Sequence, residues 1–141
     1  MQAVPMSGIS SPKPSKALLL MIEKVAKPHL IKNPRAQAIT LNFKDPGYGP
    51  EQGGFHPVEI RMERQGDAYV VSYITDFAYV GLGDCAELAK ALDFDWGQDC
   101  FEAHGFPPQP LKDGKDLYPI FEANFLSYHQ NGVFEVSVSL D

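Results

Sequence analysis

A predicted β-hairpin constrains the fold of this chain more than any other feature of its sequence. Two segments in which apolar and polar residues alternate, 58–63 and 69–77, are separated by a short polar stretch around Gly66-Asp67. Alternation with a period of two is typical of a half-buried strand, and glycine tolerates the positive φ of a two-residue hairpin turn. Because 69–77 carries apolar residues on both faces, we expect it to be a central strand covered on both sides.

Three further segments show the same strand period. Together with a helix expected near each end of the chain, they predict the α+β class: a twisted, mostly antiparallel sheet of five or more strands, with an N-terminal helix and a helix before the last strand. The additional expected strands are 38–44, 92–96 and 134–140.

Two long helices are expected from apolar stripes with helical spacing. The first covers 15–27, with Ser15 as its N-cap and Pro28 ending it. The second begins at Asp116 as N-cap and continues to about residue 130, since Pro119 falls in its first turn, where proline is tolerated.

The segment 84–92 is ambiguous between helix and strand. Asp84 followed three residues later by Glu87 matches the pattern of a capping box at the start of a helix. We therefore expect a short helix there.

The chain has the size of one domain. It contains 141 residues, of which 44% are hydrophobic, which is enough to bury a sizeable core, and it shows no internal repeat. Residues 1–14 are rich in proline and serine and are expected to form a flexible leader. Residues 15–141 are expected to form a single α+β domain.

Acidic residues concentrate in the second half of the chain. Residues 1–71 hold nine Lys or Arg and six Asp or Glu, whereas residues 72–141 hold three and twelve, and the whole chain has a net charge of −6. A net negative charge repels the phosphates of nucleic acids, so direct binding of DNA or RNA is not expected. It favours encounter with basic proteins.

The cysteines and the start of the chain indicate a reducing compartment. Cys85 and Cys100 are too few for a disulfide framework. No basic stretch followed by an apolar one precedes the first helix, and no apolar run approaches the ~20 residues that cross a bilayer. We expect a cytoplasmic protein that does not enter a membrane.

Catalytic, cofactor and metal sites are not expected. Cys100 and His104 are four residues apart, but the paired short spacings of structural zinc sites are absent. The glycine-rich segment 45–54 lacks the lysine and the helix of a phosphate-binding loop, and no nucleophile-elbow or dinucleotide motif occurs. We predict no catalytic residue, no cofactor and no metal ligand.

Two sets of residues are candidates for binding a protein partner. The first is an acidic run on and after the expected strand 92–96, for which a solvated strand face is the alternative interpretation. The second belongs to the loop that contains EQGGFHP, for which turn formation is the alternative. The two sets are Asp93, Asp95, Asp99 and Glu102, and Tyr48, Glu51, Gln52, Phe55 and His56.

The segment 39–79 carries motifs that resemble a known family. These are NFKDPGY, EQGGFHPVEI and YITDFAY, with looser similarity at LDFDW and in FEANFLSYHQNGVFEVSVS. They resemble an uncharacterised bacterial family of unknown function, DUF2787, which is similar in fold to the mitochondrial acidic matrix glycoprotein family that binds the globular heads of a complement component. The resemblance implies a twisted antiparallel sheet with helices at both ends of the chain. In the mitochondrial family this fold forms a ring-shaped trimer, and no catalytic residue is carried over.

Charge, composition and resemblance together favour one functional hypothesis. We expect a non-enzymatic, acidic protein-binding module that self-associates and binds basic protein partners. One alternative is a small-molecule-binding or hydrolytic enzyme with a pocket at the EQGGFHP loop, in which Glu51 and His56 converge as acid and base. Another is a DNA-mimic inhibitor of a nucleic-acid-binding protein.

Overall fold

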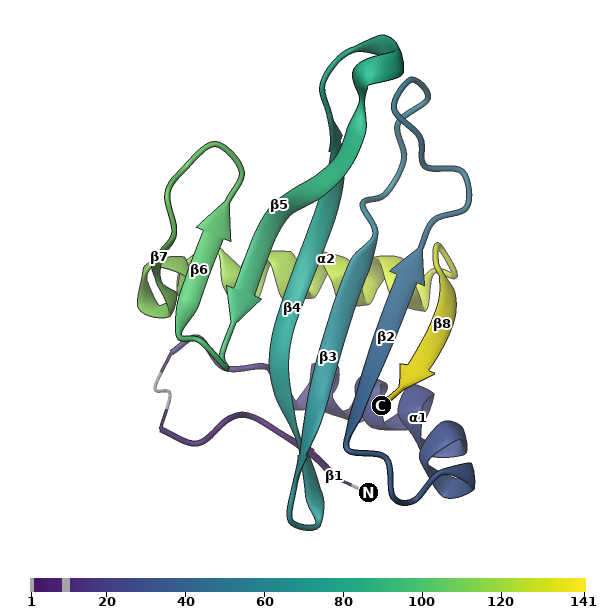
Figure 1. Cartoon of the computed structure of the whole chain (residues 1–141), viewed down its shortest axis with the longest axis vertical. Helices are drawn as coiled ribbons and strands as arrows, with labels where there is room; N and C mark the ends of the chain where they lie inside the picture. The colour runs from purple at the N-terminus through teal and green to yellow at the C-terminus, as the bar shows by residue number, and fades with distance from the viewer. Residues whose placement is uncertain (1, 9–10) are drawn as a thin grey trace.

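A computed structural model describes residues 2–8 and 11–141 and contains an eight-stranded sheet (Figure 1). The strand order is β7-β6-β5-β4-β3-β2-β8, with antiparallel neighbours throughout, and β1 pairs in parallel with β4 off this path. The strands are β1 Gln2–Val4, β2 Ala38–Lys44, β3 Val58–Gln65, β4 Ala68–Val80, β5 Glu87–Asp95, β6 Cys100–Ala103, β7 Gln109–Pro110 and β8 Glu135–Leu140.

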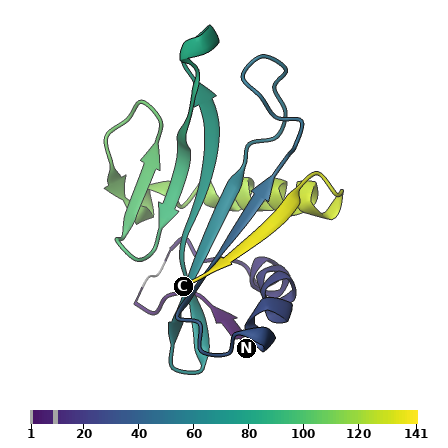
Figure 2. The same cartoon turned by 45° about the vertical axis from the view of Figure 1, so that its right-hand side comes forward.

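Two helices, α1 Lys16–Lys32 and α2 Tyr118–Gln130, lie on the same side of the sheet (Figures 1 and 2). Short 3-10 helices occupy Gly83–Cys85 and Leu111–Gly114. The expected α+β class, with a helix near the N-terminus and another before the last strand, is confirmed.

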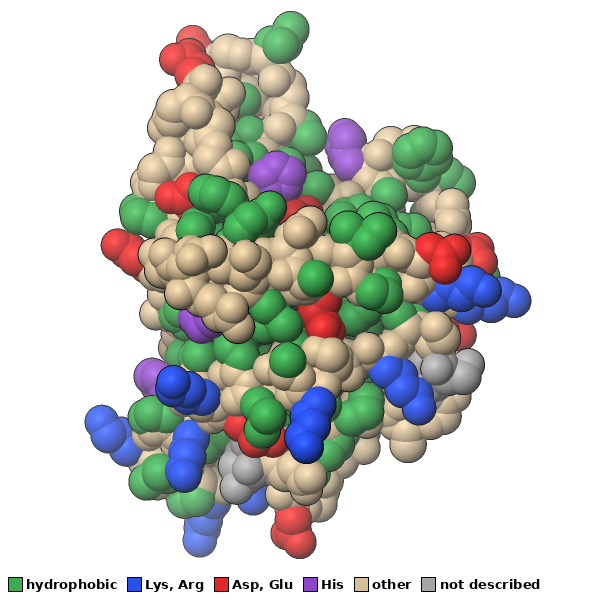
Figure 3. Space-filling model, turned by 180° about the vertical axis from the view of Figure 1, so that it is seen from behind, with side chains coloured by type: hydrophobic (Ala, Val, Ile, Leu, Met, Phe, Trp, Pro, Cys, Tyr) green, Lys and Arg blue, Asp and Glu red, His purple; other side chains and the backbone are tan. Residues whose placement is uncertain are grey.

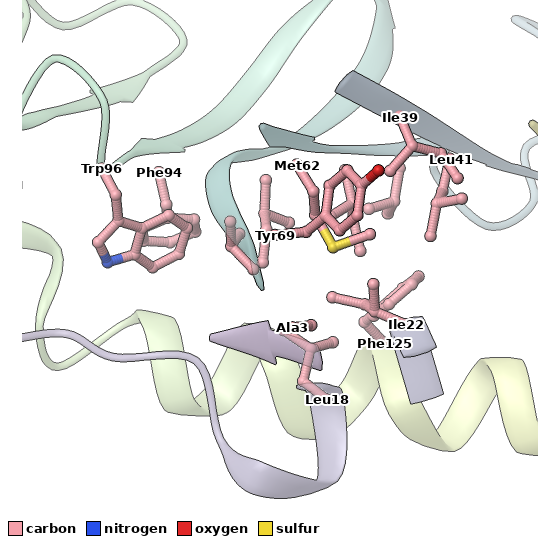
Figure 4. Close-up of a cluster of buried hydrophobic side chains, with 14 of the residues drawn as sticks. Ala3, Leu18, Ile22, Ile39, Leu41, Met62, Tyr69, Phe94, Trp96 and Phe125 are labelled. Atoms are coloured by element: carbon pink, nitrogen blue, oxygen red, sulfur yellow. The ribbon is translucent and has the colours of Figure 1, made fainter. Parts of the chain in front are cut away.

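The core lies between the sheet and the two helices (Figure 4). Side chains from β2, β3 and β4 point from the sheet toward the helices. On α1, a stripe of buried apolar residues spaced four apart faces them. The fully or nearly buried residues of that stripe are Leu18, Ile22, Ala26 and Leu30. Burial of one such aliphatic side chain contributes about 1.5–3 kcal/mol, so this stripe is the main attachment of α1.

The predicted hairpin is present and joins β3 to β4. Gly66 has a φ of 61°, and Gln65 pairs with Ala68 across the turn. Further along, the register shifts: Arg61 faces Tyr73 but Met62 faces Val71, so β4 holds one extra residue in a bulge.

The bulge explains why 69–77 carries apolar residues on both apparent faces. Tyr69 and Val71 before it and Ile74 after it all join the buried core, because the extra residue shifts the alternation. Helices cover only one side of this strand, but Val70, Ser72 and Thr75 are 3%, 8% and 2% exposed as well, so its residues are largely buried on both faces. The expectation that it is central is confirmed.

Proline 28 does not end α1, as we had expected. Ser15 caps the helix through its hydroxyl, which accepts the Leu18 N–H at 3.1 Å, but the helix continues through Pro28 to Lys32. A proline inside a helix removes one hydrogen bond. Burial of Leu30, one turn beyond Ala26 on the same stripe, offsets that loss.

The segment 84–92 is not a helix, which corrects the prediction. It forms a short 3-10 turn and then β5, whose residues pair along β4 from Val80 to Tyr73. A helix of nine residues is marginal by itself. Pairing with the thirteen-residue β4 satisfies the backbone groups of both strands.

Asp116 does not cap α2, which begins two residues later at Tyr118. Leu117 occupies the cap position with helical dihedral angles and no side-chain hydrogen bond, because the preceding 3-10 helix leads almost directly into α2. Pro119 lies in the first turn, as expected.

The segment expected to be a flexible leader contributes a strand and a hydrogen bond to the fold. Residues 2–4 form β1, and Ala3 is buried in the core. The Trp96 indole N–H donates to the Pro12 carbonyl at 2.8 Å in a buried position. Strand periodicity did not predict β1, because three residues are too few to show a period.

Candidate functional site

The sheet face turned away from the helices, here called the open face, is polar and covered by no helix of the described chain; Figure 1 looks onto it. A hollow of about 470 Å³ lies on this face, between β3, β4 and β5. Its lining contains four carboxylates and two basic groups. These are Glu59, Glu63, Asp93 and Asp95, with Arg61 and Lys90.

The pairing of β5 with β6 concentrates acidic residues on the open face. Asp93 lies directly opposite Glu102, and Asp95 lies opposite Cys100. Like charges placed opposite each other destabilise a sheet. Burial, together with the negative charges around it, raises the pKa of the Cys100 thiol. This part of the open face therefore has a negative potential that a cation would relieve.

Asp93 is held in place inside this cluster by two contacts. It is 5% exposed, accepts the Thr75 hydroxyl at 2.6 Å and lies 3.4 Å from the Lys90 ammonium. Asp95 is half-buried and accepts the Gln98 N–H at 2.9 Å, and burial raises the pKa of its carboxyl.

Asp99 lies in the turn between β5 and β6 with a φ of 51°, and it is exposed. Glu102 is half-buried on β6. Together with Asp95, these two carboxylates leave negative charge at the surface beside the satisfied Asp93.

The β3 side of the open face is held by a polar network. Arg61 contacts Asp141 at 2.9 Å and donates to the Thr40 hydroxyl at 3.2 Å, while the Tyr73 hydroxyl donates to Glu59. Burial raises the pKa of Tyr73, and the bond to Glu59 adds to this effect. The positive charge of Arg61 is thus matched locally, which leaves the open face negative.

Asp45 organises the loop that contains the second candidate set. Its carboxylate accepts the N–H groups of Phe55 at 3.0 Å and Gly47 at 2.9 Å, and these bonds lower its pKa. Gly54 has a φ of 129°, and a Cβ there would lie 2.8 Å from Asp45 Oδ2. This close approach explains a glycine at position 54.

Tyr48 of this loop packs on the end of β4. The Tyr48 hydroxyl accepts the Tyr79 N–H at 3.0 Å, and the Tyr48 ring lies 5.2 Å from the Tyr79 ring and 5.5 Å from the His56 ring. Glu51 and Gln52 are exposed at the loop tip.

The structure does not bring the two candidate sets together. Phe55 and His56 line a second hollow, on the helix side of the sheet beside α2, whereas the acidic set lies on the open face. Within the described chain His56 Nδ1 lies 3.0 Å from Asp76 Oδ2, and no contact joins His56 to Glu51. The expected convergence of His56 and Glu51 is therefore wrong. Sequence reasoning missed Asp76, whose signal was a lone acid within the apolar strand YITDFAY.

No metal centre or membrane span emerges from the described part of the chain. No three His, Cys, Asp or Glu side chains there converge in a group able to hold a metal ion. Among these residues, no helix has the length and apolar character needed to cross a bilayer.

Comparisons with known proteins point to one family. A family model described as "Protein of unknown function (DUF2787)" matches residues 16–139. A search of the curated proteins finds no match.

Two solved structures, both of hypothetical proteins from Vibrio cholerae, are similar to the chain. A conserved hypothetical protein from pathogenicity island VPI-2, described as sharing structural homology with the human P32 protein, is 33% identical, with a TM-score of 0.78 over 89% of this chain and 94% of the other. A protein from the VSP-II island is 31% identical, with a TM-score of 0.78 over 89% and 93% of the two chains.

Proposed function

Because this chain belongs to the DUF2787 family of proteins of unknown function, membership assigns no activity, and we propose from its surface that it is a non-enzymatic, cytoplasmic protein-binding module. The proposed site is the open face, which binds a basic segment of a partner. The observation that carries this proposal is the set of carboxylates on β3, β5 and β6 on the side of the sheet that no helix of the described chain covers.

The proposal follows from how the charges are held. Asp93 is already contacted by Thr75 and Lys90, so it acts as a fixed negative centre. Asp95 and Glu102 beside it are half-buried, and their carboxylates accept the cation of the bound segment. A Lys or Arg side chain above them relieves the repulsion between Asp93 and Glu102. Such pairs speed association and set orientation more than they add affinity.

Self-association is the second part of the proposal, and it is supported by charge on the opposite side of the molecule. Figure 3 shows Lys and Arg side chains gathered along α1 on the helix side. A contact between the basic side of one copy and the open face of another joins unlike surfaces, and such contacts close into rings or extend as filaments. The exposed basic residues on or beside α1 are Lys13, Lys16, Lys24, Lys27, Lys32 and Arg35.

Charge reversal on the open face tests partner binding. Asp95→Lys with Glu102→Lys should weaken binding to a lysine-rich peptide by at least about tenfold at low salt, and the loss should shrink as salt is raised. Asp113→Lys with Asp116→Lys is the matched control, because both residues are exposed, Asp113 in the 3-10 helix Leu111–Gly114 and Asp116 between it and α2, and neither lines the hollow of this face. Equal effects of the two pairs would refute a specific site.

Light scattering at about 50 mM and 500 mM salt tests self-association. The proposal expects a species larger than one chain at low salt that dissociates at high salt. Lys24→Glu with Lys27→Glu on α1 should reduce that species. A single chain at every concentration and salt level would remove this part of the proposal.

The DNA-mimic alternative differs in one measurable respect. It requires that duplex DNA compete with this chain for the same basic protein. Arg61 and Lys90 lie within the hollow of the open face and interrupt its negative charge, which disfavours a continuous row of phosphate-like groups.

A further inference from the structure

The second hollow, on the helix side of the sheet, has a volume of about 450 Å³, which suits a small molecule. It lies between α2 and three residues of the sheet, on the other side of the sheet from the open face. These residues are Val58 of β3, Asp76 of β4 and Leu92 of β5. Aromatic and aliphatic side chains form most of its wall. Figure 3 views this side and shows hydrophobic side chains gathered over and above α2. The apolar lining residues are Val58, Leu92, Leu117, Ile120, Phe121, Phe125 and Phe134, with Phe55 and Tyr128 as a ring pair 4.6 Å apart.

A buried carboxylate breaks this apolar wall. Asp76 is only 8% exposed, and its Oδ2 lies 3.0 Å from His56 Nδ1. Its other oxygen, Oδ1, is buried and has no hydrogen-bond partner of good geometry in the described chain. Burial raises the pKa of Asp76, and this effect exceeds the opposing influences of His56 and of the nearby Leu92 backbone N–H.

This arrangement is costly unless something else contacts the carboxylate. A buried acceptor left without a donor loses the interactions that water would provide. An apolar residue at position 76 would fill the same wall without that loss. We therefore expect Asp76 Oδ1 to accept a hydrogen bond from a bound ligand.

The charges around the hollow select the kind of donor. Apart from His56, which already contacts Asp76, its lining includes no basic side chain among the described residues, and the Asp45 carboxylate lies close behind the Gly54 part of the wall. A carboxylate or phosphate on a ligand would be repelled here, whereas an ammonium group would be attracted. Faces of Tyr and Phe rings add a favourable contact for such a cation.

We propose that this hollow binds a small amine, with its ammonium group at Asp76 and an aromatic or branched apolar body against α2. Phe55 and His56 belong to the segment 54–57, which is neither helix nor strand. Admission of the head group to the buried Oδ1 requires these two side chains to shift, which the irregular backbone of this segment permits without disturbing the sheet. The site is distinct from the open face, so it goes beyond the proposed protein binding.

Three probes with one indole body and different head groups test this inference. Tryptamine carries an ammonium, tryptophol a hydroxyl and indole-3-acetate a carboxylate. Titration calorimetry of the full chain near neutral pH should give tryptamine the tightest binding, at least about tenfold tighter than indole-3-acetate.

Variants separate this site from other acidic surfaces. Asp76→Asn should abolish the preference for tryptamine over tryptophol, while tryptophol binding reports that the apolar wall is intact. Glu102→Gln, on the open face, is the matched control and should leave the binding of all three probes unchanged. The inference is overturned if indole-3-acetate binds as tightly as tryptamine, if the preference survives in Asp76→Asn, if Glu102→Gln removes it, or if no probe saturates at millimolar concentration.

Discussion

Replacement of Glu122 is expected to loosen the junction between the two helices. This carboxylate on α2 is 7% exposed, accepts the Tyr118 hydroxyl at 2.5 Å and accepts the Ser15 N–H at the start of α1 at 3.0 Å. Glu122→Ala removes both bonds and leaves the buried Tyr118 hydroxyl without a partner. Glu122→Gln retains the size of the side chain and one acceptor oxygen.

The expected magnitude follows from these two contacts. A hydrogen bond to a charged group contributes about 1.5–3 kcal/mol, so two bonds amount to about 3–6 kcal/mol. The variant also no longer bears the free-energy cost of burying a carboxylate on folding, which offsets part of this loss. We therefore expect Glu122→Ala to lower the free energy of unfolding by about 2–4 kcal/mol, and Glu122→Gln by about half as much.

Urea unfolding measures this change. With a slope of about 2 kcal/mol per molar urea for a chain of this size, Glu122→Ala should shift the midpoint by about 1–2 M. A double-mutant cycle with Tyr118→Phe should give a coupling energy of about 1–2 kcal/mol. A loss below about 0.5 kcal/mol for Glu122→Ala, or a coupling near zero, would refute this account of the junction.

Three further changes test other parts of the structure. Trp96→Phe should lower the free energy of unfolding by about 1–3 kcal/mol, because it leaves the buried Pro12 carbonyl without its donor; thermal unfolding measures this. Gly54→Ala should cost about 1–3 kcal/mol in the same assay, since a φ of 129° and a Cβ at 2.8 Å from Asp45 strain the loop; an unchanged midpoint would contradict the close approach. The raised pKa of Asp76 means that its carboxyl holds a proton more tightly in the folded chain than in the unfolded chain, where its pKa is near 3.8. The stability of the wild type relative to Asp76→Asn should therefore decrease as pH rises through the folded pKa, and urea unfolding across pH would show no such trend if the carboxyl were solvated.

Local signals predicted those elements whose structure is decided locally. The turn at Gly66 and the cap at Ser15 each depend on a few adjacent residues, and both are present. Pro28 and the segment 84–92 were predicted wrongly because burial of Leu30 and pairing with β4 act over longer distances than a capping pattern.

The sites were harder to predict than the fold. The acidic run of β5 was visible in the sequence, but its pairing with Glu102 and the burial of Asp93 depend on register. Asp76 was missed because the bulge in β4 places it on the helix side, and no alternation pattern shows where an extra residue enters a strand.

The separation of charge across the thickness of the sheet gives the molecule an electric dipole. Carboxylates predominate on one broad surface, and ammonium and guanidinium groups line α1 behind it. An approaching polycation would experience a torque before any contact forms, so collisions would begin in a restricted range of orientations. Because dissolved ions shorten the reach of that field to about 8 Å at physiological ionic strength, the salt concentration would change how often a polycation reaches this surface.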